Sequence, residues 1–394
     1  MERAYDIALF GATGFVGELT ARYLATPAPR EARIALAGRS VAKLEALRER
    51  LASPDLGVIT ADASDPESLA KLAESARVVV STVGPYLKYG EPLVAACVAA
   101  GTDYIDLTGE PEFVDLMYLR YHALARQSGA RLVHSCGFDS IPYDLGALFT
   151  VNQLPDDVPI ALRGFVSAKG SISGGTFQSA VGVLGRVKEA GRASRQRRSV
   201  ERNADDGRLA EGRSVRGIPG KAHREPLVGG WVVPAPTIDP QNVLRSARLN
   251  AAYGPDFTYS HFVATRRLGK TAGLYLGVGV VALFAQVEPT RRVLLKLKAA
   301  GSGPSEARRE KSFFKVRFVA DHSDGDRLIT EVRGGDPGYG ETSKMLAESA
   351  LCLAFDALPV GGGLWTPAHA LGRPLIDRLV KAGITFTVAE PSAL

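Results

Sequence analysis

Three glycines near the start of the sequence have the spacing of a nucleotide-binding loop. They follow an apolar run at residues 5–10 and precede a segment at 18–25 that is a predicted helix. In this G-x-x-G-x-x-G pattern the glycines allow a tight turn, close approach to a pyrophosphate and helix–strand packing, while amides at the helix start bind the phosphates. A glycine-rich turn of a flavodoxin-like domain is the alternative. The residues expected to bind a dinucleotide are Gly11, Ala12, Thr13, Gly14, Phe15, Val16 and Gly17.

The residues that end the second predicted strand, 33–38, favour one form of the cofactor. NAD-specific domains usually have an acidic residue here, which binds the ribose 2′-hydroxyl. This sequence has Arg39 and Ser40 instead. A guanidinium and a hydroxyl suit a 2′-phosphate, because charge-assisted hydrogen bonds contribute roughly 1.5–3 kcal/mol each. We therefore expect NADP(H) rather than NAD(H); the alternative is that Arg39 is a solvated residue at a strand end.

Two further segments are expected to contact the cofactor. A third predicted strand, 56–60, ends near Asp62, at a position that commonly faces the adenine. The alternative role, capping the next helix, suits Ser64 or Asp65 better. A buried strand then runs into a glycine exit, at the usual place for the nicotinamide side of the cofactor. The residues of this exit are Ser81, Thr82, Val83, Gly84 and Pro85.

The first 150 residues alternate between predicted strands and predicted helices. Such alternation predicts an α/β fold of the Rossmann type, with a doubly wound parallel sheet. The alternation stops near residue 150. We expect an NADP-binding Rossmann domain at 1–150, an inserted α+β domain for substrate binding or dimerisation at 151–335, and C-terminal helices at 336–394 that pack back on the Rossmann domain.

One predicted helix, at about 176–202, is very basic in its second half. A solvated helix face explains such a run of charge. The alternative is a landing surface for an acidic partner, such as anionic lipid headgroups or an acyl-carrier domain. The basic residues are Arg186, Lys188, Arg192, Arg195, Arg197, Arg198 and Arg202.

Residues 271–287 form an apolar stretch without charges. As a helix this stretch would span about 25 Å, which is the short limit for a bilayer. A buried or interfacial helix is the main expectation, followed by a helix that docks on a membrane surface and then by a true span. Basic residues flank the stretch on both sides: Arg266, Arg267, Lys270, Arg291 and Arg292.

The composition sets the broad class of the protein. Its 394 residues suffice for two domains and a large core. The net charge of +6, from 48 basic and 42 acidic residues, is modest, so no nucleic-acid partner is expected. Three scattered cysteines predict a reducing, cytoplasmic setting without disulfides or structural zinc. We expect no signal peptide, because the first strand begins almost at Met1.

Several enzyme classes lack their signature residues here. Short-chain dehydrogenases need Tyr-x-x-x-Lys, and no tyrosine of this sequence has a lysine four places on. There is no Walker-type phosphate loop and no G-x-S-x-G elbow. Neither H-E-x-x-H nor a cluster of cysteine and histidine occurs, so no metal is expected.

Four blocks carry a family likeness: residues 6–24, 33–40, 81–110 and the distinctive CGFDSIPYDLG at 136–146. With them the chain resembles the saccharopine-dehydrogenase-like oxidoreductases, and among those the trans-acting enoyl reductases of mycobacterial lipid synthesis. The likeness covers nearly the whole chain and is weakest at about 185–310. It implies NADP(H) and reduction of an enoyl double bond on an acyl chain bound to a polyketide synthase.

The reaction that the resemblance implies needs a donor for the enolate oxygen and a proton for the α-carbon. Residues 136–144 follow the sixth predicted strand, 131–134, at the sheet edge where ligands bind. Tyr143 and Tyr86 have phenols able to donate to a thioester oxygen. Asp139 and Ser140 could orient the substrate or the nicotinamide amide. Helix capping with a rigid proline turn is an equal alternative for 139–144.

Three functions remain open on the sequence alone. The first is an NADPH-dependent reductase of a lipid-linked or carrier-bound acyl substrate, which the apolar helix and the basic run would fit. The second is a saccharopine-type reductase of another small substrate, which would need basic side chains to hold carboxylates. The third is a non-catalytic NADP-binding protein in peripheral contact with a membrane, such as the inner face of the plasma membrane. Homo-oligomers are common among Rossmann enzymes, but the sequence shows no interface.

Overall fold

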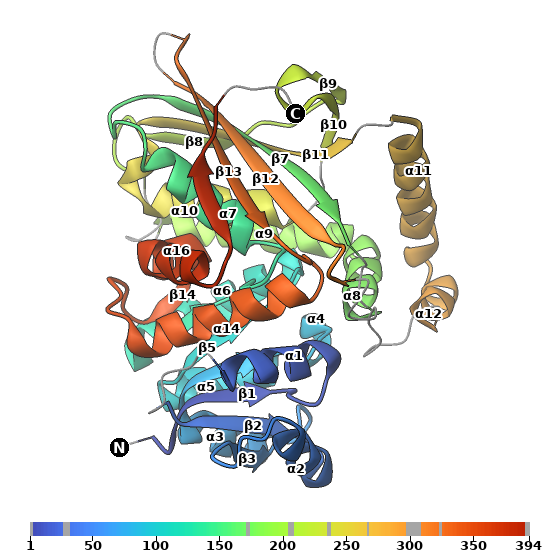
Figure 1. Ribbon diagram of the computed structural model, residues 1–394, viewed down its shortest axis with the longest axis vertical. Coiled ribbons are helices and arrows are strands. Elements are labelled where there is room, and N and C mark those ends of the chain that lie inside the picture. Colours follow the sequence, from blue (N-terminus) through green and yellow to red (C-terminus); the bar gives the residue numbers. More distant parts are fainter. Residues whose placement is uncertain are drawn as a thin grey trace.

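The structure is a computed structural model that describes residues 3–26, 32–170, 174–203, 209–234, 238–265, 268–296, 309–322 and 325–390. Within these ranges, two β-sheets lie one above the other, with helices between and around them (Figure 1). The first strand of the chain belongs to the lower sheet and the last strand to the upper sheet.

The lower sheet is the predicted Rossmann-type sheet, which is confirmed. In the described residues it has seven parallel strands, in the order β14-β6-β5-β4-β1-β2-β3. The strand order reverses between β1 and β4, and doubly wound sheets bind ligands at such a switch point. The strands are β1 (Tyr5–Phe10), β2 (Ile34–Gly38), β3 (Gly57–Thr60), β4 (Ala76–Ser81), β5 (Asp103–Asp106), β6 (Arg131–Val133) and β14 (Gly363–Trp365).

Helices cover both faces of this sheet, and the central strand shows why. Ile7 and Leu9 of β1 pack into one core with α1, α2 and α14, whereas Ala8 and Phe10 pack into the other with α3, α5 and α6. Side chains alternate between the faces of a strand, so a strand covered on both sides is apolar throughout. The helices are α1 (Phe15–Leu24), α2 (Val41–Arg50), α3 (Pro66–Ser75), α4 (Tyr86–Tyr89), α5 (Glu91–Ala100), α6 (Pro111–Ser128) and α14 (Gly340–Phe355).

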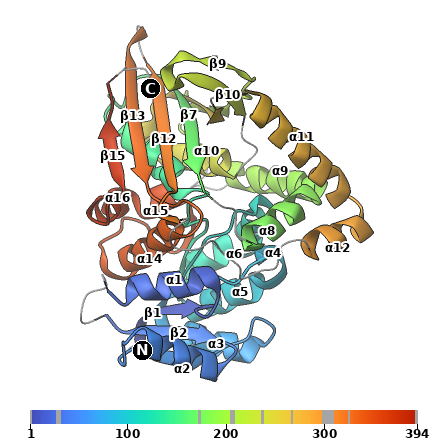
Figure 2. The same ribbon diagram turned by 45° about the vertical axis from the view of Figure 1, so that its right-hand side comes forward.

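The upper sheet is mixed and, in the described residues, has eight strands (Figure 2). Its order is β15-β13-β12-β7-β11-β10-β9, and β8 pairs with β11. Helix α7 (Ile141–Val151) packs against β12 and β13, and α10 (Asp239–Leu249) packs against β11. The strands are β7 (Ile160–Lys169), β8 (Ser214–Gly217), β9 (His223–Glu225), β10 (Gly230–Pro234), β11 (Asp256–Thr265), β12 (Phe313–Asp321), β13 (Arg327–Gly334) and β15 (Thr385–Val388).

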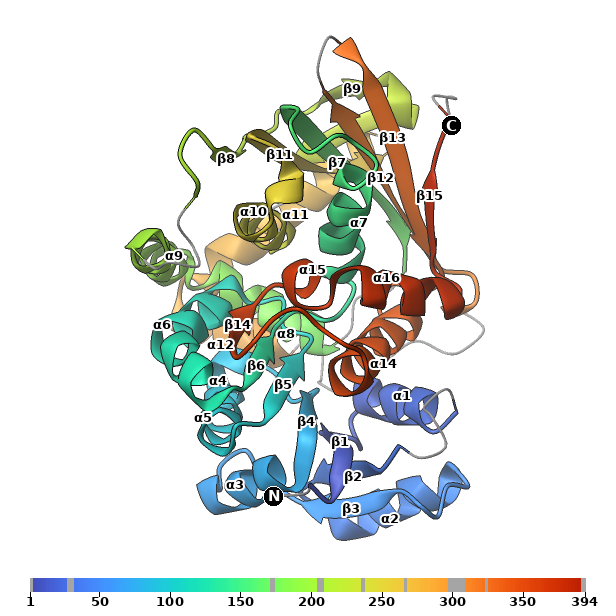
Figure 3. The same ribbon diagram turned by 90° about the vertical axis from the view of Figure 1, so that its left-hand side faces the viewer.

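The last segment of the chain contributes a strand to each sheet. β14 lies beside β6, with Gly363 opposite Arg131, and β15 lies beside β13. The sequence does not predict these two strands, because three or four residues are too few to show a periodicity. Between them, α15 (Pro367–Ala370) and α16 (Gly372–Lys381) lie between the two sheets, next to α7 (Figure 3).

The prediction of one helix at 176–202 is wrong. The chain forms two helices there, α8 (Gly174–Leu184) and α9 (Val187–Asn203). Gly185 lies between them, and a Cβ at this position would be 2.7 Å from the carbonyl oxygen of Ala285. The break therefore allows the backbone to approach the end of α11 (Leu268–Ala285) closely.

Helix α11, which contains most of the apolar stretch, lies at the side of the molecule with α8 and α12 (Glu288–Lys296) (Figures 1 and 2). A buried helix is the wrong expectation for its C-terminal end, since Leu283 is 70% exposed and Phe284 is also exposed. Among the described residues, no helix is both long and apolar enough to cross a membrane. The flanking Arg266 and Arg267 lie outside the described residues.

A buried network of charges joins α6, α9 and α10. Arg197 of α9 donates to Asp115 of α6 at 2.5 Å and also to Glu201, one turn further along α9. Arg245 of α10 donates to Glu201 at 2.6 Å. Because all four residues are buried, each charge depends on its partners for compensation. Arg197 is thus an internal residue of the fold and no part of an exposed basic surface.

We predict that Arg197→Met lowers the free energy of unfolding by about 3–5 kcal/mol, because Asp115 is then buried without a cation. Arg192→Met, at an exposed position of the same helix, is the matched control and should change it by less than about 0.5 kcal/mol. Urea unfolding followed by circular dichroism measures both variants. Equal midpoints for the two would contradict a structural role for the network.

Candidate functional site

The glycine loop has two positions that leave no space for a side chain. Gly11 has φ +86°, and a Cβ on it would lie 2.6 Å from Oγ1 of Thr82. A Cβ on Gly17 would lie 2.1 Å from the carbonyl oxygen of Gly11. The Thr82 hydroxyl is also within 3.1 Å of the carbonyl oxygen of Phe10, to which it donates. The first turn of α1 and the end of β4 therefore both pack directly on the loop.

The start of α1 is open to a ligand. Its N-cap residue is Gly14, which provides no side-chain cap, and both Thr13 and Gly14 are exposed. The first amides of α1 therefore lack the side-chain acceptor that often satisfies them, and a phosphate can take that place. These glycine contacts and the uncapped helix fit the pyrophosphate of a dinucleotide.

The predicted 2′-phosphate residues lie where β2 ends. Arg39 is exposed, and no hydrogen bond or ion pair to a described residue holds its guanidinium. Ser40 is the N-cap of α2, and its oxygen accepts from the amide of Lys43 at 3.4 Å, which leaves the hydroxyl proton free to donate. Asp62 accepts from Ser64 at 2.7 and 2.8 Å. These bonds, and to a smaller extent Arg39, lower the pKa of Asp62.

The exit of β4 contains a cis peptide bond between Gly84 and Pro85. Tyr86 follows it, and its hydroxyl donates to the carbonyl oxygen of Ser81 at 3.0 Å. The amides of Tyr86 and Leu87 donate to the carboxylate of Glu110 at 3.0 and 2.9 Å. Because its hydroxyl is engaged by the backbone, Tyr86 is the less favourable of the two predicted proton donors.

Asp139 and Ser140 are neighbours with different surroundings. Ser140 is fully buried, and its oxygen accepts from the side-chain amide of Asn242 at 2.6 Å. Asp139 is exposed, and desolvation by the surrounding protein raises the pKa of its carboxyl group. Phe138 donates its amide to the Thr342 hydroxyl at 3.2 Å, which attaches this loop to α14.

Tyr143 lies behind this loop, with its ring edge-to-face on His261 at 4.9 Å between centroids. Burial, followed by the charges of Asp239 and Asp139, raises the pKa of Tyr143 well above its usual value, so the phenol is protonated at neutral pH. No hydrogen bond to a described residue engages its hydroxyl. Burial also lowers the pKa of His261 to about 4, so this imidazole is neutral. A neutral ring can accept the 3.1 Å hydrogen bond from the hydroxyl of Tyr259.

The C-terminal segment links the glycine loop to the loop that carries Asp139. The ring of Tyr339 packs edge-on against Phe15 with 4.8 Å between centroids. Thr342, three residues further on, accepts the amide of Phe138. The site residues predicted from the sequence end at Tyr143, so the sequence did not predict this link. Tyr339 and Thr342 belong to segments that extend the family likeness, but their contacts with the two loops depend on the fold.

One further set of residues, around Asp106, was not predicted from the sequence. Asp106 accepts from the amides of Thr108 and Ser135 at 3.1 and 3.0 Å and lies 2.7 Å from Nδ1 of His134, so it fixes the loops after β5 and β6. In the part of the chain that the structure describes, no group of side chains could hold a metal ion. An Asp at the end of a strand commonly fixes neighbouring loops in this way, but the sequence does not identify the groups that Asp106 binds.

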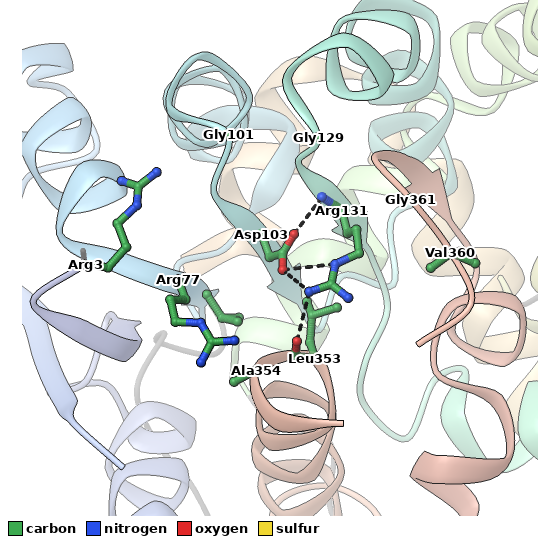
Figure 4. A pocket seen from close by; sticks show the side chains of 11 residues that line it. Arg3, Arg77, Gly101, Asp103, Gly129, Arg131, Leu353, Ala354, Val360 and Gly361 are labelled. Carbon is green, nitrogen blue, oxygen red and sulfur yellow. Dashed lines mark hydrogen bonds and ion pairs between the residues drawn. The ribbon is translucent and has the colours of Figure 1, made fainter. Parts of the chain in front are cut away.

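A polar pocket at the opposite, amino-terminal edge of the lower sheet has its charges largely satisfied (Figure 4). Arg131 binds Asp103 through two nitrogens and also donates to the carbonyl oxygen of Leu353. Arg77 pairs with Asp6 at 3.5 Å. This pocket lies away from the loops that follow the strands, so we assign it no part in the site.

Comparison with known proteins places this site in a family. Residues 7–133 match the family model of the saccharopine dehydrogenase NADP binding domain. A putative trans-acting enoyl reductase of Mycobacterium tuberculosis is 39% identical, with 98% of this chain and 97% of that protein covered. The trans-acting enoyl reductase of Mycobacterium ulcerans is 34% identical, with 99% of each chain covered.

A solved structure has the same fold. Saccharopine dehydrogenase (L-Glu forming) from Saccharomyces cerevisiae superposes with a TM-score of 0.55 and 14% identity, covering 98% of this chain and 100% of the other. The family model confirms the expectation of NADP(H) as the cofactor. The chain therefore belongs to the saccharopine-dehydrogenase-like family of NADP(H)-dependent oxidoreductases, together with the mycobacterial trans-acting enoyl reductases.

Proposed function

We propose that this protein is a trans-acting enoyl reductase, which reduces the enoyl double bond of an acyl thioester with NADPH. The thioester is carried by a polyketide synthase or a separate carrier domain. Two full-length relatives with this name, at 34% and 39% identity, support the reaction. The observation that carries the proposal concerns the phosphate loop and the segment 138–143, which runs from the loop after β6 into the first turn of α7 and ends at Tyr143. Both follow strands of the lower sheet, and the start of α14 contacts both of them, through Phe15 and Phe138.

The proposed roles of the residues follow from their contacts. Residues 11–17 hold the pyrophosphate, Arg39 and Ser40 hold the 2′-phosphate, Asp62 faces the adenine, and residues 81–85 lie beside the nicotinamide. Bound NADPH supplies the hydride. Tyr143 donates a hydrogen bond to the thioester oxygen, which stabilises the enolate. Asp139 and Ser140 orient the substrate, Ser140 through a position fixed by Asn242.

The assignment of functions to three segments of the chain is also a proposal. Residues 1–150 bind the cofactor, 151–335 bind the acyl chain, and 336–394 connect the two. The exposed apolar end of α11 supports a peripheral contact with lipid, by which a greasy acyl chain would stay near the enzyme. A saccharopine-type substrate is the second candidate, which would need basic side chains beside Tyr143 to hold its carboxylates.

We predict that Arg39→Ala weakens NADPH binding by about tenfold or more, because it removes a charge-assisted contact with the 2′-phosphate. NADH binding should stay unchanged, since NADH has no such phosphate. Arg50→Ala, at the other end of α2, is the matched control and should leave both affinities unchanged. Fluorescence titration measures the two dissociation constants. An unchanged NADPH affinity in Arg39→Ala would refute the assignment.

We predict that Tyr143→Phe lowers kcat for an enoyl thioester by roughly 10²–10³-fold, the usual effect of losing one oxyanion donor. Tyr86→Phe should retain kcat within about threefold and instead lower stability, by about 1 kcal/mol for one buried hydrogen bond. Both variants keep the aromatic ring, so a difference in kcat between them does not result from lost ring packing. NADPH oxidation followed by absorbance measures turnover. Full activity in Tyr143→Phe would exclude Tyr143 as the donor.

A further inference from the structure

The strongest feature outside the cofactor edge is a recess lined by four arginines. Three of them, Arg195, Arg198 and Arg202, come from α9, and Arg248 comes from α10. The recess has a volume of about 440 Å³, which is enough for a phosphate group with part of its carrier. No other residue type lines it in the part of the chain that the structure describes.

Helix α9 divides its arginines between two roles. Within α9, Arg197 binds Asp115 and Glu201, and Arg186, which directly precedes the helix, donates to Glu112 through two nitrogens at 2.8 and 2.6 Å. The three arginines of the recess follow the i, i+3, i+7 spacing of one helix face, and they are exposed. No ion pair or hydrogen bond to another described residue engages their guanidinium groups. The charges that stabilise the fold and those that line the recess are thus separate sets.

Arg248 adds a fourth cation from the neighbouring helix. It is half-buried, and burial is the largest effect that lowers its pKa. Glu201 opposes this shift, and the charges of Arg197, Arg198 and Arg202 add to it. Glu201 is itself already bound by Arg197 and Arg245. By contrast, Arg213 beside it donates hydrogen bonds to four carbonyl oxygens at and just after the end of α10, those of Ala247, Arg248, Asn250 and Gly254.

Four guanidinium groups around one hollow repel one another unless an anion separates them. The polar pocket of Figure 4 shows the usual arrangement, in which Arg131 is paired with Asp103. The recess lacks such a carboxylate among the described residues. Guanidinium groups bind phosphate through two parallel hydrogen bonds, and a phosphate has enough oxygens and charge to engage several of them at once.

We propose that this recess is a second phosphate-binding site, separate from the cofactor site, for a phosphate ester or diphosphate group. Two kinds of molecule could supply this phosphate group. One is coenzyme A or a carrier-bound phosphopantetheine, and the other is an anionic lipid headgroup. The inference does not require the proposed reaction, because binding is measured without turnover.

The test titrates inorganic pyrophosphate into the full-length protein saturated with NADP⁺, so that the cofactor site is occupied. The variant is the double substitution Arg198→Gln and Arg202→Gln. Arg192→Gln, on the same helix but outside the recess, is the matched control. Retained NADPH affinity in all three proteins shows that the fold and the cofactor site are intact. Isothermal titration calorimetry at two salt concentrations gives the dissociation constants.

We expect the wild type and Arg192→Gln to bind pyrophosphate alike, and the double variant to bind at least about tenfold more weakly. Binding should also weaken at the higher salt concentration, because exposed charges are screened. Pyrophosphate binding that is absent in the wild type, or equal in the double variant, would overturn the proposal. A failure here with normal NADPH oxidation would leave the proposed function standing.

Two further arms distinguish the source of the phosphate. Coenzyme A is titrated in the same way, and vesicles of phosphatidylglycerol in phosphatidylcholine are tested by flotation. Loss of coenzyme A binding in the double variant assigns the recess to a thioester carrier, whereas loss of vesicle binding alone assigns it to a lipid headgroup. Binding of both probes that is unaffected by the double variant would contradict the site.

Discussion

The close packing of α1 on the loop before it is the contact on which the rest of the structure depends. Gly17 sits against the carbonyl oxygen of Gly11, where a Cβ would be only 2.1 Å away. This contact sets where α1 starts and leaves its first amides facing outward, at the reversal of strand order between β1 and β4. The same loop is held from the other side by Thr82 at the end of β4. Any side chain at either glycine would displace the helix or the loop.

Residues from the second half of the chain also contact this edge of the lower sheet. The C-terminal segment adds β14 to the lower sheet and β15 to the upper sheet, and α14, which precedes both strands, packs against α1. Tyr23 of α1 donates to Glu348 of α14 at 2.7 Å. Through Tyr339 and Thr342, this helix then contacts both the glycine loop and the loop that carries Asp139. The two sheets are therefore coupled at the point where we propose that chemistry occurs.

The first domain was predictable because each of its signals is local. A glycine triplet between a strand and a helix, and an arginine where NAD enzymes have an acid, need no distant partner to be read. The upper sheet was harder to predict from the sequence, because its strands pair across long stretches of the chain, as β7 does with β11 and β12. Short strands such as β14 have too few residues for a period. The break at Gly185 depends on Ala285, a hundred residues away, which no local pattern reveals.

Sequence also could not rank the candidate donors, because that depends on contacts. Tyr86 and Tyr143 are equivalent as residue types, and only the bond from Tyr86 to Ser81 separates them. Likewise, the run of arginines at 186–202 is one feature in the sequence. The structure divides it into partners of carboxylates, Arg186 with Glu112 and the buried Arg197 with Asp115, and a set around a recess that no other described residue pairs. Asn242 and His261 belong to no sequence motif. Only the structure shows that Asn242 contacts Ser140 and that His261 contacts Tyr143.

The most direct test of the account is a single-turnover reaction of the wild-type protein with bound NADPH and a short enoyl thioester. Absorbance reports loss of the reduced nicotinamide, and mass spectrometry reports the saturated thioester. The account predicts that one equivalent of NADPH is consumed per equivalent of saturated product, and that the reaction does not occur with the saturated thioester. Tight NADPH binding without any product would contradict the central claim that this edge of the sheet reduces an enoyl group.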